Sequence, residues 1–172
     1  MILDTRTFAV FTVAVVACLW DIRTRRLPNV LTFGAAAAAM AFSLWQHGLS
    51  GLGWSVAGWL TAVALFFPFF ALRGIGAGDV KLLGALGAWF GALNALYLAA
   101  LTAVAGGVMA IAVVLLRRSV RDTSRNIWLM LMTWRAVGLR PVPGLTLDTT
   151  RGPKLAYAIP IAAGALATLW LR

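Results

Sequence analysis

Six apolar runs, separated by segments that alternately carry and lack arginine, constrain the fold of this chain more than any other feature. A helix needs about 20 apolar residues to cross the hydrocarbon core of a bilayer, and about 17 suffice. The runs lie at about residues 5–20, 30–46, 53–72, 77–91, 95–116 and 155–171, and the fourth is short and rich in glycine. We therefore predict an all-α, polytopic transmembrane bundle of about six spans, forming one membrane-embedded domain over residues 1–172.

The charge balance supports a membrane protein and argues against a nucleic-acid partner. Charged residues make up only 12% of the chain and hydrophobic residues 62%, whereas soluble domains are about a quarter charged. Fifteen Lys and Arg against five Asp give a net charge of +10, which by itself would suit nucleic acid. The basic residues lie between the apolar runs, however, as they do in cytoplasmic loops of membrane proteins. We expect a lipid bilayer as the surroundings and no nucleic acid.

The positions of the basic residues predict the orientation of the bundle. All but two of the fifteen fall in the segments 21–29, 73–81 and 117–154, which share one side of the membrane if there are six spans. The positive-inside rule makes that side cytoplasmic, so both termini would be outside. The longest of these segments, the basic loop at about 117–154, contains the apolar run 127–132. That run either lies flat in the cytoplasmic headgroup layer or packs on the bundle as a loop helix.

Two of the five aspartates, Asp21 and Asp79, stand where an apolar run meets a predicted cytoplasmic loop. Ionisable residues at membrane depth are costly, and they usually face the bundle interior or a wet cavity. Two like charges held close cannot both ionise easily, so such a pair can act as base and acid on a water that attacks a peptide carbonyl. The other three have simpler explanations: solvation for Asp4, an ion pair with neighbouring arginines for Asp122, and a turn for Asp148.

The neighbours of each aspartate, taken alone, leave two interpretations open. Residues 21–29 can be a short basic loop in which Asp21 pairs with Arg25 and Pro28 starts the next helix. Residues 73–81 place glycine at three alternate positions before Asp79. A bare backbone suits the close approach of a peptide, but it also suits a flexible turn. The same glycines agree less well with a phosphate-binding loop, because the spacing Gly-x-x-x-x-Gly-Lys-Ser/Thr is absent.

Smaller features complete the predicted framework. Gly84, Gly87 and Gly91 lie on one stretch and would let another helix pack closely. Asn94 is expected at a tight turn between the fourth and fifth spans. His47 is expected in an outer loop, away from both aspartates. The single cysteine, Cys18, is expected to be a packing residue.

Taken together, the two windows resemble the signatures of type IV prepilin peptidases. Residues 21–32, with an Asp, a basic run and Leu27-Pro28-Asn29, look like the first signature, and Gly76-Ala77-Gly78-Asp79 followed by Val80-Lys81 looks like the Gly-x-Gly-Asp signature. The resemblance implies a bacterial inner-membrane aspartic peptidase, without a metal or other cofactor, that removes the leader peptide preceding the hydrophobic helix of a prepilin at the cytoplasmic face. By matching positions it implies a catalytic pair, Asp21 and Asp79, and site-shaping or substrate-binding roles for Pro28, Asn29, Gly76, Gly78 and Lys81. Lys81 would face the membrane interface or an acidic residue of the substrate.

The chain departs from the larger members of that family in one respect. Those members carry a cytoplasmic domain with paired cysteines and also methylate the new N-terminus, whereas this sequence has one cysteine and no such domain. It resembles the compact form found with Flp-type (tight-adherence) pili, so no N-methyltransferase activity is expected. Two alternatives remain: a small proton-coupled transporter, which would place acids near mid-span within an inverted repeat, and a non-catalytic pilus assembly factor, which leaves both motifs unexplained.

Overall fold

The described part of the chain, residues 4–140 and 156–171 of a computed structural model, is built from helices and contains no strand. The helices are α1 (Thr5–Thr24), α2 (Asn29–Ala71), α3 (Ala77–Leu116), α4 (Val120–Val137) and α5 (Ala158–Trp170). Three of them, α1, α2 and α3, are long and apolar enough to cross a membrane, and α5 is a shorter apolar helix. The predicted all-α class is therefore confirmed for these residues.

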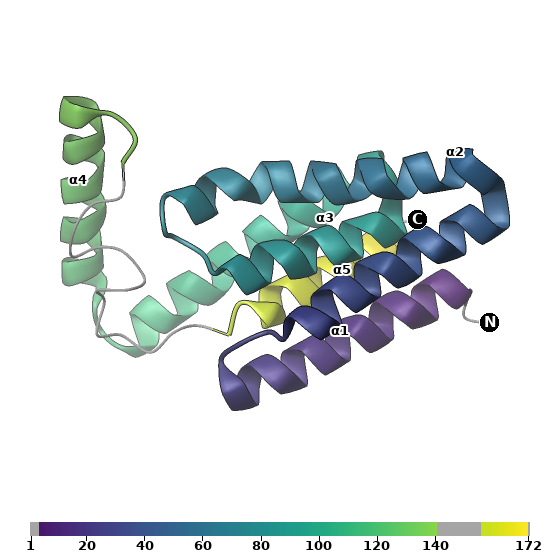
Figure 1. Cartoon of the computed structure of the whole chain (residues 1–172). Helices are drawn as coiled ribbons and strands as arrows, with labels where there is room; N and C mark the ends of the chain where they lie inside the picture. Colours follow the sequence, from purple (N-terminus) through teal and green to yellow (C-terminus); the bar gives the residue numbers. More distant parts are fainter. Residues whose placement is uncertain (1–3, 141–155, 172) are drawn as a thin grey trace.

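Both long helices, α2 and α3, fold back on themselves at a glycine (Figure 1). Gly48 has φ 61° and ψ −150°, and Gly91 has φ 75° and ψ 172°. Only glycine adopts such backbone conformations at little steric cost. The predicted turn at Asn94 is wrong, because the chain reverses three residues earlier. Asn94 lies within the helix, where its side-chain amide donates a hydrogen bond to the carbonyl of Phe90 at 3.1 Å.

The core lies where the second arm of α2, residues 49–71, packs on the first arm of α3, residues 77–90. A Cβ on Gly87 would lie 2.6 Å from the carbonyl oxygen of Gly58, and a Cβ on Gly84 would lie 2.7 Å from Val63 Cγ2. The buried Ser55 hydroxyl also donates to the carbonyl of Ala88 at 2.8 Å. The predicted close packing at these glycines is confirmed, and it makes the start of α3 the most buried part of the bundle.

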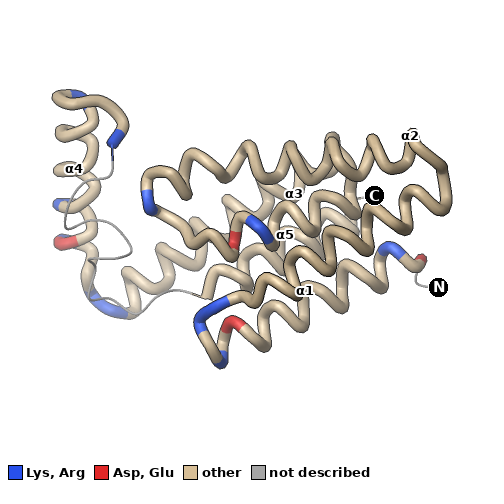
Figure 2. Tube along the Cα trace, viewed as in Figure 1, with Lys and Arg blue, Asp and Glu red and all other residues tan. Residues whose placement is uncertain are grey.

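The two chain reversals lie at one end of the bundle, and the loops that connect successive helices lie at the opposite end. The reversals within α2 and α3 and both ends of the described chain lie at one end, and the loops after α1, α2 and α3 lie at the other (Figure 1). We call the second the basic end, made of residues 21–29, 72–81 and 117–119. Figure 2 shows that most Lys and Arg of the bundle gather there.

An arginine in the left-handed conformation follows each helix that stops at the basic end. Arg25, Arg73 and Arg118 have φ of 53°, 57° and 53°. Their backbone N–H groups donate to carbonyls in the last turns of α1, α2 and α3, at 2.8, 2.8 and 3.1 Å. This conformation is uncommon outside glycine, but it closes the open carbonyls of a helix C-terminus. It also places a cation at the negative end of each helix dipole.

Helix α4 stands apart from the bundle (Figure 1), and none of its residues is buried. The described residues therefore contradict the alternative in which this segment packs on the bundle as a loop helix. Asp122 on α4 forms the predicted ion pair, with its carboxylate 3.6 Å from the guanidinium of Arg125. Of the predicted loop at about 117–154, residues 141–154 lie outside the described residues, and Asp148 is among them.

Candidate active site

Asp21 is held between the end of one helix and the start of another. It lies in the last turn of α1 and is only 6% exposed. Its Oδ2 accepts the backbone N–H of Ala158, the first residue of α5, at 3.3 Å. A carboxylate is disfavoured at the negative C-terminus of its own helix, whereas the N-terminus of α5 offers an unused N–H and a positive dipole. The start of α5 therefore stabilises and orients the Asp21 carboxylate.

Asp79 occupies the first turn of α3 and is half-buried. Its Oδ2 accepts the backbone N–H of Gly76 at 3.2 Å, which satisfies one of the open N–H groups at the helix start. A Cβ on Gly76 would lie 3.0 Å from that same oxygen. Glycine at position 76 therefore gives the carboxylate room to bend back over the start of its own helix.

The fold brings Asp21 and Asp79 together at the basic end. The two carboxylates are close enough for their charges to repel each other. Within the described residues they share no hydrogen bond, because each is turned to a backbone N–H of its own. Asp21 also forms no side-chain ion pair with Arg25 in this part of the structure. The two carboxylates are therefore near each other but separately anchored.

The loop after α1 rests on the first turn of α3. A Cβ on Gly78 would lie 3.2 Å from Leu27 Cβ, so a larger residue there would push the loop outwards. Pro28 precedes α2 with φ −69° and ψ 139°, an extended conformation that suits proline. This contact joins the two sequence windows that carry the aspartates.

A hydrogen bond joins the same two windows on the outer side. The ammonium of Lys81 donates to Asn29 Oδ1 at 2.9 Å, and it lies 5.2 Å from the centre of the Phe33 ring. A cation over an aromatic face is attracted by the ring. In this structure the Lys81 charge is thus bound within the protein, by residues from the start of α2.

Residues at the start of α5 were not expected at the site. The Cys18 thiol donates to the carbonyl of Ala158 at 3.3 Å, so the fully buried Ala158 is bound by both Cys18 and Asp21. Tyr157, next to it, lies within electrostatic reach of Asp79. The only sequence signal was that Tyr157, one of two tyrosines, lies near the start of the last apolar run. Its proximity to Asp79 depends on how α5 packs.

A separate cluster of polar side chains lies at the end of the bundle opposite the basic end. The Arg6 guanidinium lies 3.3 Å from Gln46 Oε1 and 3.2 Å from His47 Nε2, and it lies 5.0 Å from the centre of the Trp54 ring. A cavity of about 390 Å³ opens beside these residues. His47 is thus away from both aspartates, as predicted, although it contacts Arg6 rather than solvent alone.

Comparison with known proteins gives one finding. The model of the type IV leader peptidase family matches residues 8–111, which is more than half of the chain and includes both aspartates and the windows around them. No curated protein and no solved structure gives a significant match.

Proposed function

This chain belongs to the type IV leader peptidase family, and from that premise we propose that it is a membrane aspartic endopeptidase that removes the leader peptide of prepilins. The observation that carries the proposal is the approach of two carboxylates, Asp21 and Asp79, from different helices. Each is oriented by a backbone N–H, and both lie at one end of an apolar bundle.

The pair would work by general acid and base catalysis. One carboxylate takes a proton from a water molecule as the water oxygen bonds to the scissile carbonyl carbon. The other, protonated because two close charges are unfavourable, donates its proton to the carbonyl oxygen. When the intermediate collapses, the C–N bond breaks and the amine leaves with the proton that the first carboxylate took from water. The C=O double bond re-forms as a hydroxyl proton of the intermediate returns to the second carboxylate, which restores the pair. The two aspartates act as a unit, so the roles belong to the pair.

The arrangement of the arms suggests how the enzyme sits in the membrane. With the two reversals, α1, the arms of α2 and α3, and α5 make six helical arms. We propose that all six cross the bacterial inner membrane, with the basic end in the cytoplasm and both termini outside. The leader of a prepilin would then reach the aspartates at the cytoplasmic face, while its hydrophobic helix stays in the bilayer.

We further propose that the substrates are Flp-type prepilins and that the enzyme does not methylate the new N-terminus. The support is the resemblance to compact members of the family and the single cysteine, where larger members have paired cysteines. The segment 1–172 would act as one peptidase domain without a cofactor. A proton-coupled transporter is less well supported, because both aspartates lie at helix ends rather than at mid-span.

The test is to co-express the protein with a Flp-type prepilin and to measure removal of the leader peptide by the shift of the pilin band on a gel. Asp21→Asn and Asp79→Asn should each lower the cleavage rate by about 10²–10⁴-fold, because neither amide can exchange the proton. Asp122→Asn is the matched control, since Asp122 is an exposed acid in an ion pair on α4. Mass spectrometry of the mature pilin should show a free, unmethylated N-terminus.

Three results would overturn the assignment. Wild-type cleavage by both asparagine variants, each inserted in the membrane at the normal level, would reject the catalytic pair. Absence of cleavage of any prepilin, together with solute uptake that requires Asp21 or Asp79, would favour the transporter. A normal pilus assembled by the two variants, with cleavage supplied by another peptidase, would favour the assembly factor.

A further inference from the structure

Helix α4 presents a large apolar surface that the described protein does not cover. None of its residues is buried, although Ile127, Trp128 and Leu131 are 49%, 61% and 46% exposed. Burying such side chains is worth about 1.5–3 kcal/mol each. A helix with this composition is therefore expected to have a partner other than water.

The side chains of α4 form two faces. Val120, Ile127, Leu131 and Trp134 follow one another at intervals of seven, four and three residues, which places them on one stripe of a helix. Asp122, Arg125 and Asn126 lie on the opposite side. Such a helix suits an interface between an apolar and a polar medium, with its axis in the plane of that interface.

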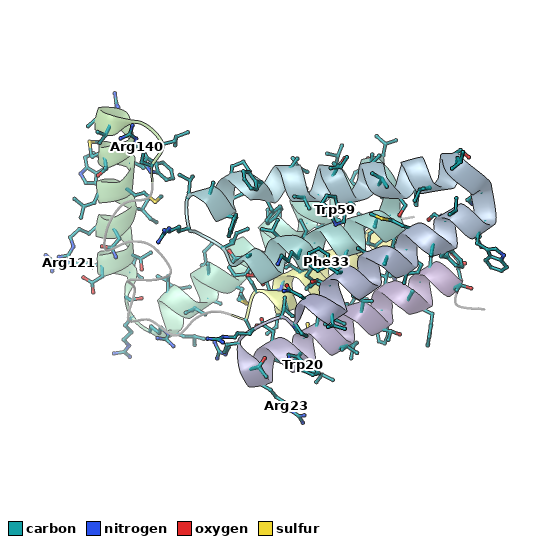
Figure 3. The ribbon with its side chains drawn as sticks, in the orientation of Figure 1. Trp20, Arg23, Phe33, Trp59, Arg121 and Arg140 are labelled. Atoms are coloured by element: carbon teal, nitrogen blue, oxygen red, sulfur yellow. The ribbon has the colours of Figure 1, made fainter. Side chains whose placement is uncertain are left out.

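Charge makes this surface selective. Between residues 117 and 140 the chain carries six arginines and a single acid, Asp122. Figure 3 shows Arg121 pointing away from the bundle on the outer side of α4. Two copies of so basic a helix would repel each other, whereas a surface of phosphate groups would attract it. Each basic residue near an anionic membrane contributes about 1 kcal/mol.

The position of α4 fits the same partner. The second arm of α3, residues 92–116, is about 37 Å long at about 1.5 Å per residue. That length exceeds the hydrocarbon core of about 30 Å, so the end of α3 reaches the headgroup layer at the basic end. Helix α4 begins after only Arg117, Arg118 and Ser119, and its axis lies across that of the bundle (Figure 1).

We propose that α4 is a lipid-binding helix, which lies in the headgroup layer of the cytoplasmic leaflet and binds anionic phospholipids through its arginines. Its apolar stripe would enter the acyl boundary, and the guanidinium groups would contact lipid phosphates. The proposal uses the membrane orientation given above but not the peptidase chemistry, so the binding can be tested without any substrate.

The experiment places a nitroxide label on either face of α4 in the full-length Cys18→Ala chain. Leu131→Cys reports the apolar stripe, and Asp122→Cys is the matched control on the opposite face. Both proteins are reconstituted in vesicles of phosphatidylcholine alone, and of equal parts phosphatidylcholine and phosphatidylglycerol. The accessibility of each label to oxygen, which enters lipid, is compared with its accessibility to a water-soluble nickel complex.

In the phosphatidylglycerol vesicles, the oxygen-to-nickel ratio at Leu131→Cys should be several-fold higher than at Asp122→Cys. Replacing Arg121, Arg125 and Arg135 by Gln, or omitting phosphatidylglycerol, should return the Leu131→Cys label to water. High salt should weaken the effect in the same direction, because it screens exposed charges.

Other outcomes would overturn the proposal. A Leu131→Cys label that stays in water in the anionic vesicles would show that α4 does not enter the membrane. An equal ratio in both lipid mixtures would remove the role of anionic lipid. A label shielded from both reagents, in proportion to the protein density in the vesicles, would point to a second copy. Shielding that requires an added prepilin would point to the substrate. None of these results depends on cleavage, so they leave the proposed peptidase activity standing.

Discussion

At the scale of single residues, the site depends on backbone N–H groups and one lysine. Asp21 and Asp79 are each oriented by a helix N-terminus, that of α5 for Asp21 and that of α3 for Asp79. Lys81 and Asn29 join the first turn of α3 to the first turn of α2. Because Asn29 follows directly on the loop from α1, we propose that this hydrogen bond helps to set the separation of the aspartates. We therefore regard Lys81 as a positioning residue.

A double-mutant cycle on Lys81 and Asn29 tests that role. Lys81→Met and Asn29→Leu should each lower the rate of prepilin cleavage, and the double variant should be no slower than the worse single variant. The expected coupling is about 1 kcal/mol, or roughly fivefold in rate, for an exposed hydrogen bond with a charged donor. Arg23→Met is the matched control, since Arg23 is an exposed cation of the same end that points away from the bundle (Figure 3). Strictly additive losses would place Lys81 in some other role, such as binding the substrate.

At the scale of elements, glycine determines how closely α2 and α3 approach. A Cβ on Gly58 would overlap the carbonyl oxygen of Gly87 and lie 2.7 Å from Gly91 Cα. The neighbouring atoms are backbone and cannot rotate away. This contact holds the first arm of α3 in place, and that arm carries Asp79 at its start.

Gly58→Ala should therefore destabilise the bundle, by about 1–3 kcal/mol or more, because a crowded core must shift its backbone. Gly53→Ala on the same arm of α2 meets no atom within 4 Å and is the matched control. It should leave stability equal or raise it by up to about 1 kcal/mol, since alanine favours helix over glycine. Thermal unfolding in detergent, followed by circular dichroism, measures both. Equal melting temperatures for the two variants would contradict the packing described here.

At the scale of the whole molecule, the bundle has two chemically different ends. Arginines close the helices at the end that holds the aspartates, and the reversals at Gly48 and Gly91 form the other. Short loops with few charges at one end and arginine-rich loops at the other are the arrangement by which membrane insertion is oriented. This polarity supports the proposed orientation, with the basic end in the cytoplasm.

Thiol labelling in intact cells tests the orientation. His47→Cys should react with a membrane-impermeant maleimide from outside, because it lies beside the reversal at Gly48. Arg118→Cys should react only after the cells are permeabilised, because it lies at the basic end. The unaltered chain, with its partly buried Cys18, gives the background. Labelling of Arg118→Cys in intact cells, with protection of His47→Cys, would invert the topology and place the aspartates outside.

The amino-acid sequence determined the helical class, the apolar character of the bundle, the polarity of its loops and the two aspartates worth attention. These features are local, because each depends on the composition and order of one stretch of chain. Close packing at Gly84 and Gly87 was also predictable, since small residues at helical spacing are a local pattern as well.

Only the tertiary structure decided which groups meet at the aspartates. The bond from Ala158 to Asp21 joins residues 137 positions apart, and Lys81 reaches Asn29 across 52 positions. Tyr157 comes near Asp79 because of the way α5 packs. The reversal falls at Gly91 rather than Asn94 because the turn needs a positive φ with an extended ψ, which glycine adopts at little steric cost. Such contacts depend on which helices become neighbours, and no single stretch of sequence carries that information.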